Sequence, residues 1–207
     1  MTSPDWLVAF AELPRRISRD DLAMIPHGGD EETRSSAVLI LLGDSGDGPD
    51  VLLTQRSSRL RNHAGQPAFP GGAIDPGDES ASAAAVREAV EETGVEPSGI
   101  VVLGELPTLW LPPSNFHVTP VLAWWAEPSP VAPIDLGEVE RVERITFAEF
   151  AEPANRYRIK LSSGIIGPAF KAGGLTVWGF TAGVIDRLLY LTGREIPWES
   201  DRMLSRP

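Results

Sequence analysis

Hydrophobic residues in this chain fall into short apolar runs separated by turns rich in Gly, Pro and Asp. Residues 37–42 are a continuous run of leucine and other apolar residues, and the turn sequence GDSGDGPD separates them from a second run at residues 51–55. Apolar runs between turn signals are typical of buried strands joined as a hairpin. The same pattern predicts further strands at residues 100–109, 117–125, 165–170 and 175–178.

A helix with two unlike sides is predicted at residues 80–93, where Gly and Pro are absent and Ala is frequent. Gly94 follows it and is a residue typical of helix ends. At about 100° per residue, one side of this helix is apolar and the other is acidic. The apolar side contains Ala83, Val86, Ala89 and Val90, and the acidic side contains Glu88, Glu91 and Glu92. Two further amphipathic helices are predicted at residues 4–13 and 181–192.

The glutamates on the acidic side of the helix are close enough to repel one another. Glu88 lies one turn before both Glu91 and Glu92, so the like charges repel by a few tenths of a kcal/mol per pair. A divalent cation would reverse this penalty, and ligands that offer only oxygen favour Mg²⁺ or Mn²⁺. The alternative is an acidic face that is only solvated.

A basic loop precedes this helix. Residues 52–72 contain Arg56, Arg59 and Arg61 but no Asp or Glu, and they end in a Pro-Gly-Gly turn where the backbone can approach a ligand closely. Arg87, one turn before Glu91, can hold that carboxylate in place. A basic loop that leads into a carboxylate cluster predicts a site for a metal-bound polyphosphate.

Composition narrows the function classes. The chain has 207 residues and a mass of 22.3 kDa, which fits one domain with extensions. It contains no Cys, which excludes disulfides and thiolate chemistry. A net charge of -11 argues against nucleic acid and anionic membranes as partners. Since no signal-like segment or apolar run of about 18 residues is present, a cytoplasmic protein is expected.

The residues from the Pro-Gly-Gly turn to the end of the helix resemble the Nudix hydrolase family. The second half of the Nudix box is matched by Arg87, Glu88, Ala89, Glu91, Glu92, Gly94 and Val95. The first half can be aligned in two ways. Counting from Gly72 makes Asp78 the first acid and leaves eight residues before Arg87, whereas counting back from Arg87 makes Glu79 the acid and puts Ala73 at the glycine position.

A box that is one residue longer, with Asp as its first acid, resembles the coenzyme A diphosphatase branch of this family. The upstream signature of that branch is matched at every fixed position, by Leu52, Leu53, Thr54, Arg56, Ser57, Arg61, Gly65, Phe69, Pro70, Gly71 and Gly72. The resemblance implies metal-dependent hydrolysis of the diphosphate of coenzyme A or its thioesters, giving 3′,5′-ADP and 4′-phosphopantetheine or its acyl form.

The resemblance also implies roles for individual residues. Glu88, Glu91 and Glu92, with the Gly72 carbonyl, would hold Mg²⁺ or Mn²⁺, and Arg87 would support them. Arg56 and Arg61 would bind phosphates, because a guanidinium can form two parallel hydrogen bonds. The other substrate-binding candidates are Thr54, Ser57, Gly65, Phe69 and Gly71. Nudix enzymes often supply an extra glutamate from beyond the box; Glu138 is the candidate, followed by Glu140 and Glu143, and solvated acids at a strand edge are the alternative.

The implied fold is an α/β/α sandwich with a mixed sheet, in one domain. We expect an N-terminal helical extension and flexible loop at residues 1–34, the Nudix domain at residues 35–193, and a tail at residues 194–207 that wanders or docks on a partner subunit of a homodimer. Two alternative functions stay open. One is hydrolysis of ADP-ribose, NADH or another nucleoside diphosphate derivative, and the other is a nucleotide-binding module without catalysis.

Overall fold

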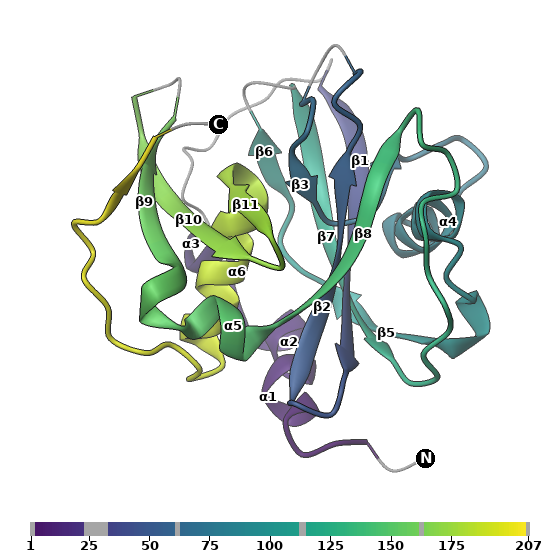
Figure 1. The fold of residues 1–207 in the computed structure, drawn as a ribbon. Helices are drawn as coiled ribbons and strands as arrows, with labels where there is room; N and C mark the ends of the chain where they lie inside the picture. Colours follow the sequence, from purple (N-terminus) through teal and green to yellow (C-terminus); the bar gives the residue numbers. More distant parts are fainter. Residues whose placement is uncertain (1–2, 23–32, 61–62, 112–114, 162–163, 206–207) are drawn as a thin grey trace.

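The computed structural model describes residues 3–22, 33–60, 63–111, 115–161 and 164–205. Within these residues the chain forms an eight-stranded mixed sheet and a separate four-stranded sheet. Figure 1 shows the order of the layers: helix α4, the large sheet, helices α5 and α6, and the small sheet. The predicted α/β fold with a mixed sheet is confirmed.

The two longest strands of the large sheet, β1 and β7, are neighbours and run parallel to each other. The path through the sheet is β3-β2-β1-β7-β5, while β4 pairs with β1, β6 with β7, and β8 with β2. Its strands are β1 (Arg34–Asp44), β2 (Pro49–Arg56), β3 (Pro67–Ala68), β4 (Gly71–Ala73), β5 (Ile100–Glu105), β6 (Leu109–Leu111), β7 (Phe116–Trp125) and β8 (Val139–Thr146).

A wedge between β1 and β2 holds the Pro-Gly-Gly turn. The two strands pair only near their hairpin, where Leu42 lies opposite Val51. Farther along, β3 pairs with β2 and β4 pairs with β1, so residues 67–73 fill the space between the diverging strands. A Cβ atom on Gly71 would lie 2.3 Å from the carbonyl oxygen of Ala37, so only glycine fits there.

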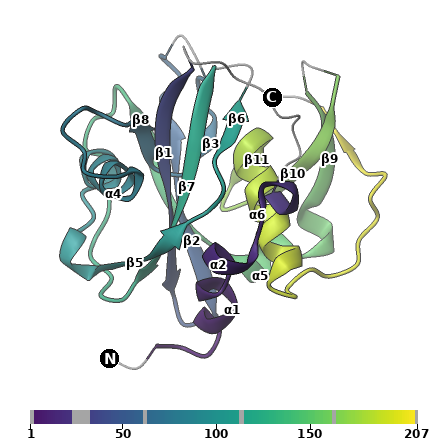
Figure 2. The same cartoon turned by 180° about the vertical axis from the view of Figure 1, so that it is seen from behind.

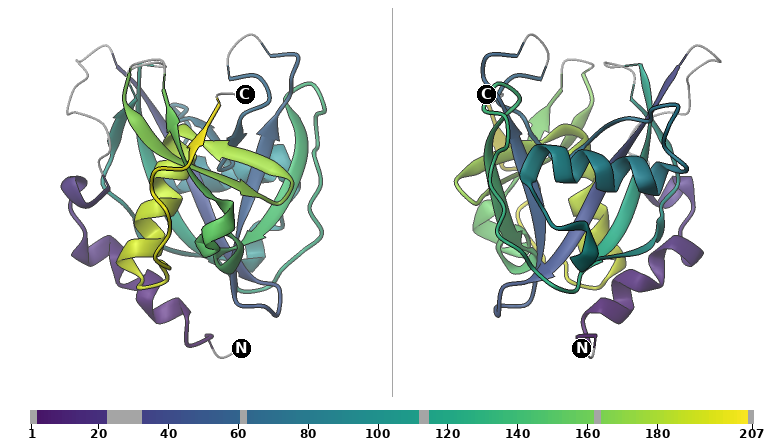
Figure 3. Two further views of the ribbon diagram at one scale, coloured as in Figure 1. Left: turned by 60° about the vertical axis from the view of Figure 1, so that its left-hand side comes forward. Right: turned by 90° about the vertical axis from the view of Figure 1, so that its right-hand side faces the viewer.

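Two hydrophobic cores lie on opposite faces of the large sheet. One face packs against α4 (Ala81–Thr93), where the alanines at 84, 85 and 89 let the helix approach the strands closely. The other face packs against α5 (Phe147–Ala151), α6 (Gly179–Leu191) and the small sheet. The right panel of Figure 3 shows α4 lying across the sheet. Residues that alternate along one strand therefore point toward different layers.

The small sheet contains β9 (Arg156–Lys160), β10 (Ile166–Ala172), β11 (Leu175–Trp178) and β12 (Met203–Leu204). Its strand order is β11-β10-β9-β12. The tail was expected to wander or dock on a partner subunit, and this is wrong for residues 203–204, which pair in parallel with β9 of the same chain. Strand β9 was also missed, because its alternation of basic and apolar residues does not form an apolar run.

Two predicted elements are divided in the structure. The predicted strand at residues 100–109 ends at Glu105, and β6 starts separately at Leu109. The predicted helix at residues 4–13 is two short helices, α1 (Leu7–Ala11) and α2 (Leu13–Arg16), with Pro14 in the first turn of the second. Figure 2 shows them with α3 (Arg19–Leu22) on the reverse side of the molecule.

The remaining regular elements are the short 3-10 turns η1 (Pro97–Gly99) and η2 (Pro153–Asn155). Every helix in the described ranges falls short of the length and apolar character needed to cross a membrane.

Candidate active site

Helix α4 is held at both ends. The Ser80 hydroxyl accepts a hydrogen bond from the backbone N–H of Ala83 at 3.1 Å, which caps the first turn. Glu105, at the end of β5, accepts further bonds from the Ser82 N–H and hydroxyl, at 3.2 and 2.9 Å. Gly94 ends the helix in a left-handed conformation with a φ of 68°. These contacts fix the position of the helix and of the acids that it carries.

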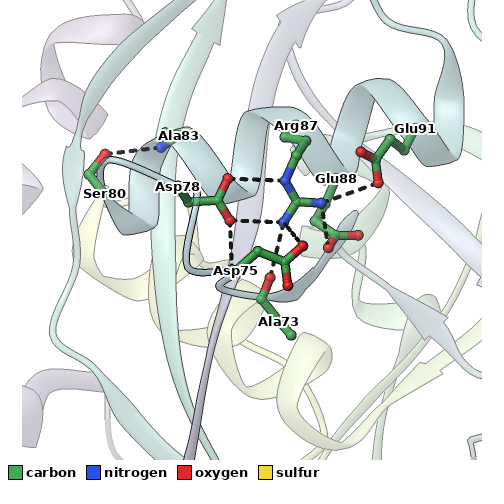
Figure 4. Close-up of polar contacts among 8 residues, drawn as sticks. All are labelled: Ala73, Asp75, Asp78, Ser80, Ala83, Arg87, Glu88 and Glu91. Atoms are coloured by element: carbon green, nitrogen blue, oxygen red, sulfur yellow. Dashed lines mark hydrogen bonds and ion pairs between the residues drawn. The ribbon is translucent and has the colours of Figure 1, made fainter.

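Arg87 is the centre of an ionic cluster on this helix, drawn in Figure 4. Its guanidinium donates two parallel hydrogen bonds of 3.0 Å to Asp78 and one of 3.1 Å to the carbonyl of Ala73. It also donates to Glu88 at 2.9 Å and to Glu91 at 3.2 Å. One arginine thus joins the loop before the helix to two carboxylates of the acidic side.

The contacts of Arg87 distinguish the two alignments of the box. The side chain of Asp78 is only 7% exposed, and its hydrogen bonds from Arg87 hold its pKa below the usual range. Glu79 is exposed to solvent. Asp78 is therefore the acid that pairs with the box arginine, and the extra residue is accommodated in the loop between Gly72 and Ser80. The sequence did not reveal Asp75, whose carboxylate lies 3.7 Å from Arg87.

Glu88 faces the Pro-Gly-Gly turn. A Cβ atom on Gly72 would lie 2.5 Å from its carboxyl group, so glycine is needed there for the backbone to approach. Burial raises the pKa of Glu88, while Arg87 opposes the rise and the charges of Glu91 and Glu138 add to it. The predicted ligands Glu88 and Gly72 are therefore neighbours in space.

Glu92 is the most buried acid of the helix, with 6% of its surface exposed. Burial raises its pKa to about 8, and the charge of Glu138 contributes to the rise. The charge of Arg56 and the backbone N–H of Gly71 oppose it. Among the described residues, its Oε2 atom is buried without a hydrogen-bond partner. A buried acceptor without a partner is costly, so this atom is suited to a cation.

Arg56 lies at the end of β2, in the alternating series with Leu52 that points toward α4. Its charge acts on Glu92, and its Nε atom is buried without a hydrogen-bond partner in the described part of the chain. The predicted basic residue is therefore beside the carboxylates. Arg61, the second predicted phosphate-binding residue, lies outside the described residues.

The other predicted substrate-binding residues support the loop. Thr54, Ser57 and Phe69 are almost fully buried. Thr54 donates a hydrogen bond to the Ala68 carbonyl at 3.4 Å, and the Ser57 N–H donates one to the Glu138 carbonyl at 2.8 Å. Gly65 has a φ of 68°, which favours glycine. With Gly71, these residues shape the backbone that carries Arg56.

The three glutamates beyond the box have different surroundings. Glu138 is exposed just before β8, and its charge acts on both Glu88 and Glu92. Glu140 accepts a hydrogen bond from the Ser58 N–H at 3.3 Å, and Glu143 pairs with Arg141 at 2.5 Å. Of these three glutamates, Glu138 is thus the one whose charge acts on both Glu88 and Glu92.

The carboxylates match the ligand types that Mg²⁺ and Mn²⁺ prefer. Burial disfavours the charged forms of Glu88 and Glu92 and raises the pKa of each, and a nearby cation would offset this effect. In the described ranges, however, no three His, Cys, Asp or Glu side chains are gathered closely enough to hold a metal ion. Arg87 engages Glu88 and Glu91 instead. These bonds use one oxygen of each carboxylate, Oε1 of Glu88 and Oε2 of Glu91, so Arg87 does not engage the second oxygen of either group.

A shallow groove of about 600 Å³ lies along another side of α4. Apart from Arg87 and Glu91 at its rim, most of its lining is apolar, including Val86, Val90 and Val102. Such a surface does not suit a diphosphate, and the groove shares only Arg87 and Glu91 with the candidate site.

Comparison with known proteins identifies the family. The NUDIX domain matches residues 32–162, more than half of the chain. The uncharacterized Nudix hydrolase NudL of Escherichia coli (strain K12) is 36% identical over 204 residues, covering 93% of this chain and 96% of that protein. NudL of Citrobacter koseri is 36% identical over 203 residues with the same coverage.

Among solved structures, the Nudix hydrolase RenU from M. smegmatis superimposes with a TM-score of 0.52 at 23% identity. The match covers 78% of this chain and 86% of RenU and shows a shared fold. The family match and the NudL relatives agree with the box on α4, so this chain belongs to the Nudix family and is a hydrolase of pyrophosphate bonds.

Proposed function

We propose that this Nudix hydrolase cleaves the diphosphate of coenzyme A and its thioesters. The observation that carries the proposal is that the signature loop brings Arg56 to the acidic side of α4, where its charge acts on Glu92. The signature is matched at every fixed position, and its buried members hold this loop in place. On a protein of net charge -11, such a local basic group favours the binding of an anionic substrate.

We assign the chemical roles as follows. Glu88, Glu91, Glu92 and the Gly72 carbonyl would hold the divalent ions, which supply charge neutralisation of the diphosphate and an activated water. Arg56 would bind a phosphate oxygen pair, together with Arg61. Asp78 holds Arg87 in place through two hydrogen bonds, and Arg87 in turn orients Glu88 and Glu91.

Glu138 is the proposed general base, because it is exposed and its charge acts on both Glu88 and Glu92. Glu138 would accept a proton from a water molecule as the water oxygen forms a bond to one phosphorus. The bond from the bridging oxygen to that phosphorus breaks, and the bridging oxygen leaves with the other phosphate. The products are 3′,5′-ADP and 4′-phosphopantetheine, or its acyl form when the substrate is a thioester. Homodimerisation, a cytoplasmic location and the domain bounds 35–193 stay predictions of the sequence.

Product analysis tests this assignment. The protein would be incubated with coenzyme A, dephospho-coenzyme A, ADP-ribose and NADH, each with Mg²⁺, with Mn²⁺ or with a chelator, and the products separated by chromatography. We expect metal-dependent release of 3′,5′-ADP from coenzyme A, with slower turnover of the other three.

Equal turnover of coenzyme A and dephospho-coenzyme A would show that the 3′-phosphate is not recognised. Hydrolysis of ADP-ribose or NADH alone would replace the proposed substrate with another nucleoside diphosphate derivative. A lack of turnover with all four compounds would contradict the substrate assignment.

A further inference from the structure

His63 has an unusual backbone for an exposed residue. It lies in the loop between Arg56 and Gly71, and its φ is 56°, in the left-handed region. Residues other than glycine adopt this conformation at a cost that surrounding contacts must offset. The side chain of His63 is exposed, so hydrophobic burial does not offset it. The compensating interactions must therefore be polar.

Two hydrogen bonds close a tight turn at His63. Its Nδ1 atom lies 2.6 Å from Oε1 of Gln66, and because an amide oxygen only accepts, the imidazole N–H is the donor. The Gln66 N–H donates to the His63 carbonyl at 3.2 Å. The imidazole thus bonds to the residue whose backbone completes the turn.

The turn is attached to Arg56 through both of that residue's backbone groups. The Arg56 N–H donates to the Gln66 carbonyl at 3.0 Å, and the Gly65 N–H donates to the Arg56 carbonyl at 3.0 Å. The side chain of Gln55 adds a bond of 3.2 Å to the Gly65 carbonyl. The position of Arg56 therefore depends on the shape of the turn that His63 closes.

We propose that His63 is a positioning residue which, through Gln66, holds Arg56 where the diphosphate of the substrate binds. The inference rests on the proposed function, which makes Arg56 a phosphate-binding residue. A loop ordered in advance loses less conformational entropy when the substrate binds. His63 therefore contributes to substrate binding more than to the chemical step, and its loss should raise KM while leaving kcat nearly unchanged.

Two substitutions separate the side chain from the backbone. His63→Gly accepts a positive φ without strain but removes the imidazole, and His63→Asn tolerates the same backbone and keeps an amide donor. With coenzyme A and Mg²⁺, we expect His63→Gly to raise KM about three- to tenfold, the worth of one hydrogen bond. His63→Asn should stay within about twofold of the native KM, and kcat should change by less than about twofold in both variants.

A double-mutant cycle with Arg56→Lys tests whether His63 acts through Arg56. We expect His63→Gly to change KM by less than about twofold when Arg56 is already replaced, because the two changes disrupt one interaction. If the increase of KM in the double variant equals the product of the increases in the two single variants, His63 acts on the substrate without Arg56. A native KM in His63→Gly would also overturn the inference, as would a joint fall of kcat and melting temperature in both His63 variants.

Failure of the proposed function can be distinguished from failure of the role proposed for His63. If Arg56→Lys leaves KM unchanged, the diphosphate does not depend on the paired hydrogen bonds of the Arg56 guanidinium, and the assignment on which the inference rests is wrong. If Arg56→Lys raises KM and His63→Gly does not, only the role of His63 is wrong.

Discussion

Two arginines in this molecule each gather carboxylates, and the difference between their surroundings separates a structural cluster from a candidate active site. Arg156, in the small sheet, has a side chain that is 1% exposed and pairs with Asp186 at 2.6 Å and Glu195 at 3.0 Å. Trp198 covers its guanidinium at 4.8 Å. Arg87, on α4, is 29% exposed and faces more acids than it can neutralise. These acids are Asp75, Asp78, Glu88 and Glu91.

The excess of negative charge around α4 is larger than the contacts of Arg87 alone indicate. Glu138 adds further charge, which acts on both Glu88 and Glu92, and the charge of Glu88 also acts on Glu92. At the Arg156 cluster, two acids meet one arginine under an aromatic cover, and the tail of the chain is docked as a result. Uncompensated charge and a buried acceptor without a partner indicate where a cation and a substrate would add binding energy.

The largest expected effect is on stability and comes from the structural cluster. Arg156→Met leaves Asp186 and Glu195 without their positive partner, and removing one member of a buried ion pair typically costs about 3–5 kcal/mol. Thermal unfolding should show a clearly lower melting temperature, while kcat of the folded protein should stay close to native. Arg158→Met, on the same strand, is the matched control and should destabilise much less. Similar melting temperatures for both variants would contradict the structural role of Arg156.

The next largest effect is on catalysis and comes from the candidate site. Glu92→Gln keeps the shape of the side chain but removes a charge proposed to hold the metal ion. We expect the metal-dependent rate to fall by about a hundredfold or more, because a bound ion supplies several kcal/mol of transition-state stabilisation. Full metal-dependent activity in this variant would refute the site on α4.

The same substitution should change how stability depends on pH. In metal-free protein the folded-state pKa of Glu92 is about 8, above its usual value of 4.5, because burial disfavours the charged form. Its contribution to stability is therefore complete below about pH 4.5 and is lost as the pH rises through about 8. With a chelator, Glu92→Gln should be more stable than the native protein at pH 9, by roughly a few kcal/mol. Near pH 4 the two should be alike, and parallel curves across this range would contradict the raised pKa.

A smaller effect is expected where the box acid holds Arg87. Asp78→Asn removes the charge that receives two hydrogen bonds from Arg87, and the loss of such a supporting group typically lowers metal affinity or activity by about 10- to 100-fold. Since Arg87 keeps the pKa of Asp78 below its usual range, this difference from the native protein should persist from pH 5 upward. Steady-state kinetics at several Mg²⁺ concentrations would measure it.

The smallest effect is expected at the neighbouring acid and provides the control for Asp78. Glu79→Gln changes an exposed side chain, and its kinetics should stay within about twofold of native. A larger loss with Glu79→Gln than with Asp78→Asn would assign the box acid to the other alignment.

Features that depend on neighbours along the chain were predictable. The periodicity of residues 80–93 and Gly94 predicted α4 to within one residue, since helical spacing puts acids on one side whatever surrounds them. Apolar runs predicted most strands in the same way. The family of the protein also followed from the sequence, because the spacing of Arg87, Glu88, Glu91 and Glu92 on one helix is itself the motif.

Only the tertiary structure decided which side chains and strands pair with one another across the fold. The sequence left both Asp78 and Glu79 open as the first box acid, and the fold of the loop brought Asp78 to Arg87. It offered three glutamates beyond the box, and the pairing of β8 with β2 left Glu138 near the helix acids while Glu143 met Arg141. Strand β12 and the Arg156 cluster join residues some 40 positions apart. A charge acts on whatever lies within a few ångströms of it, and the distance along the chain does not determine that separation.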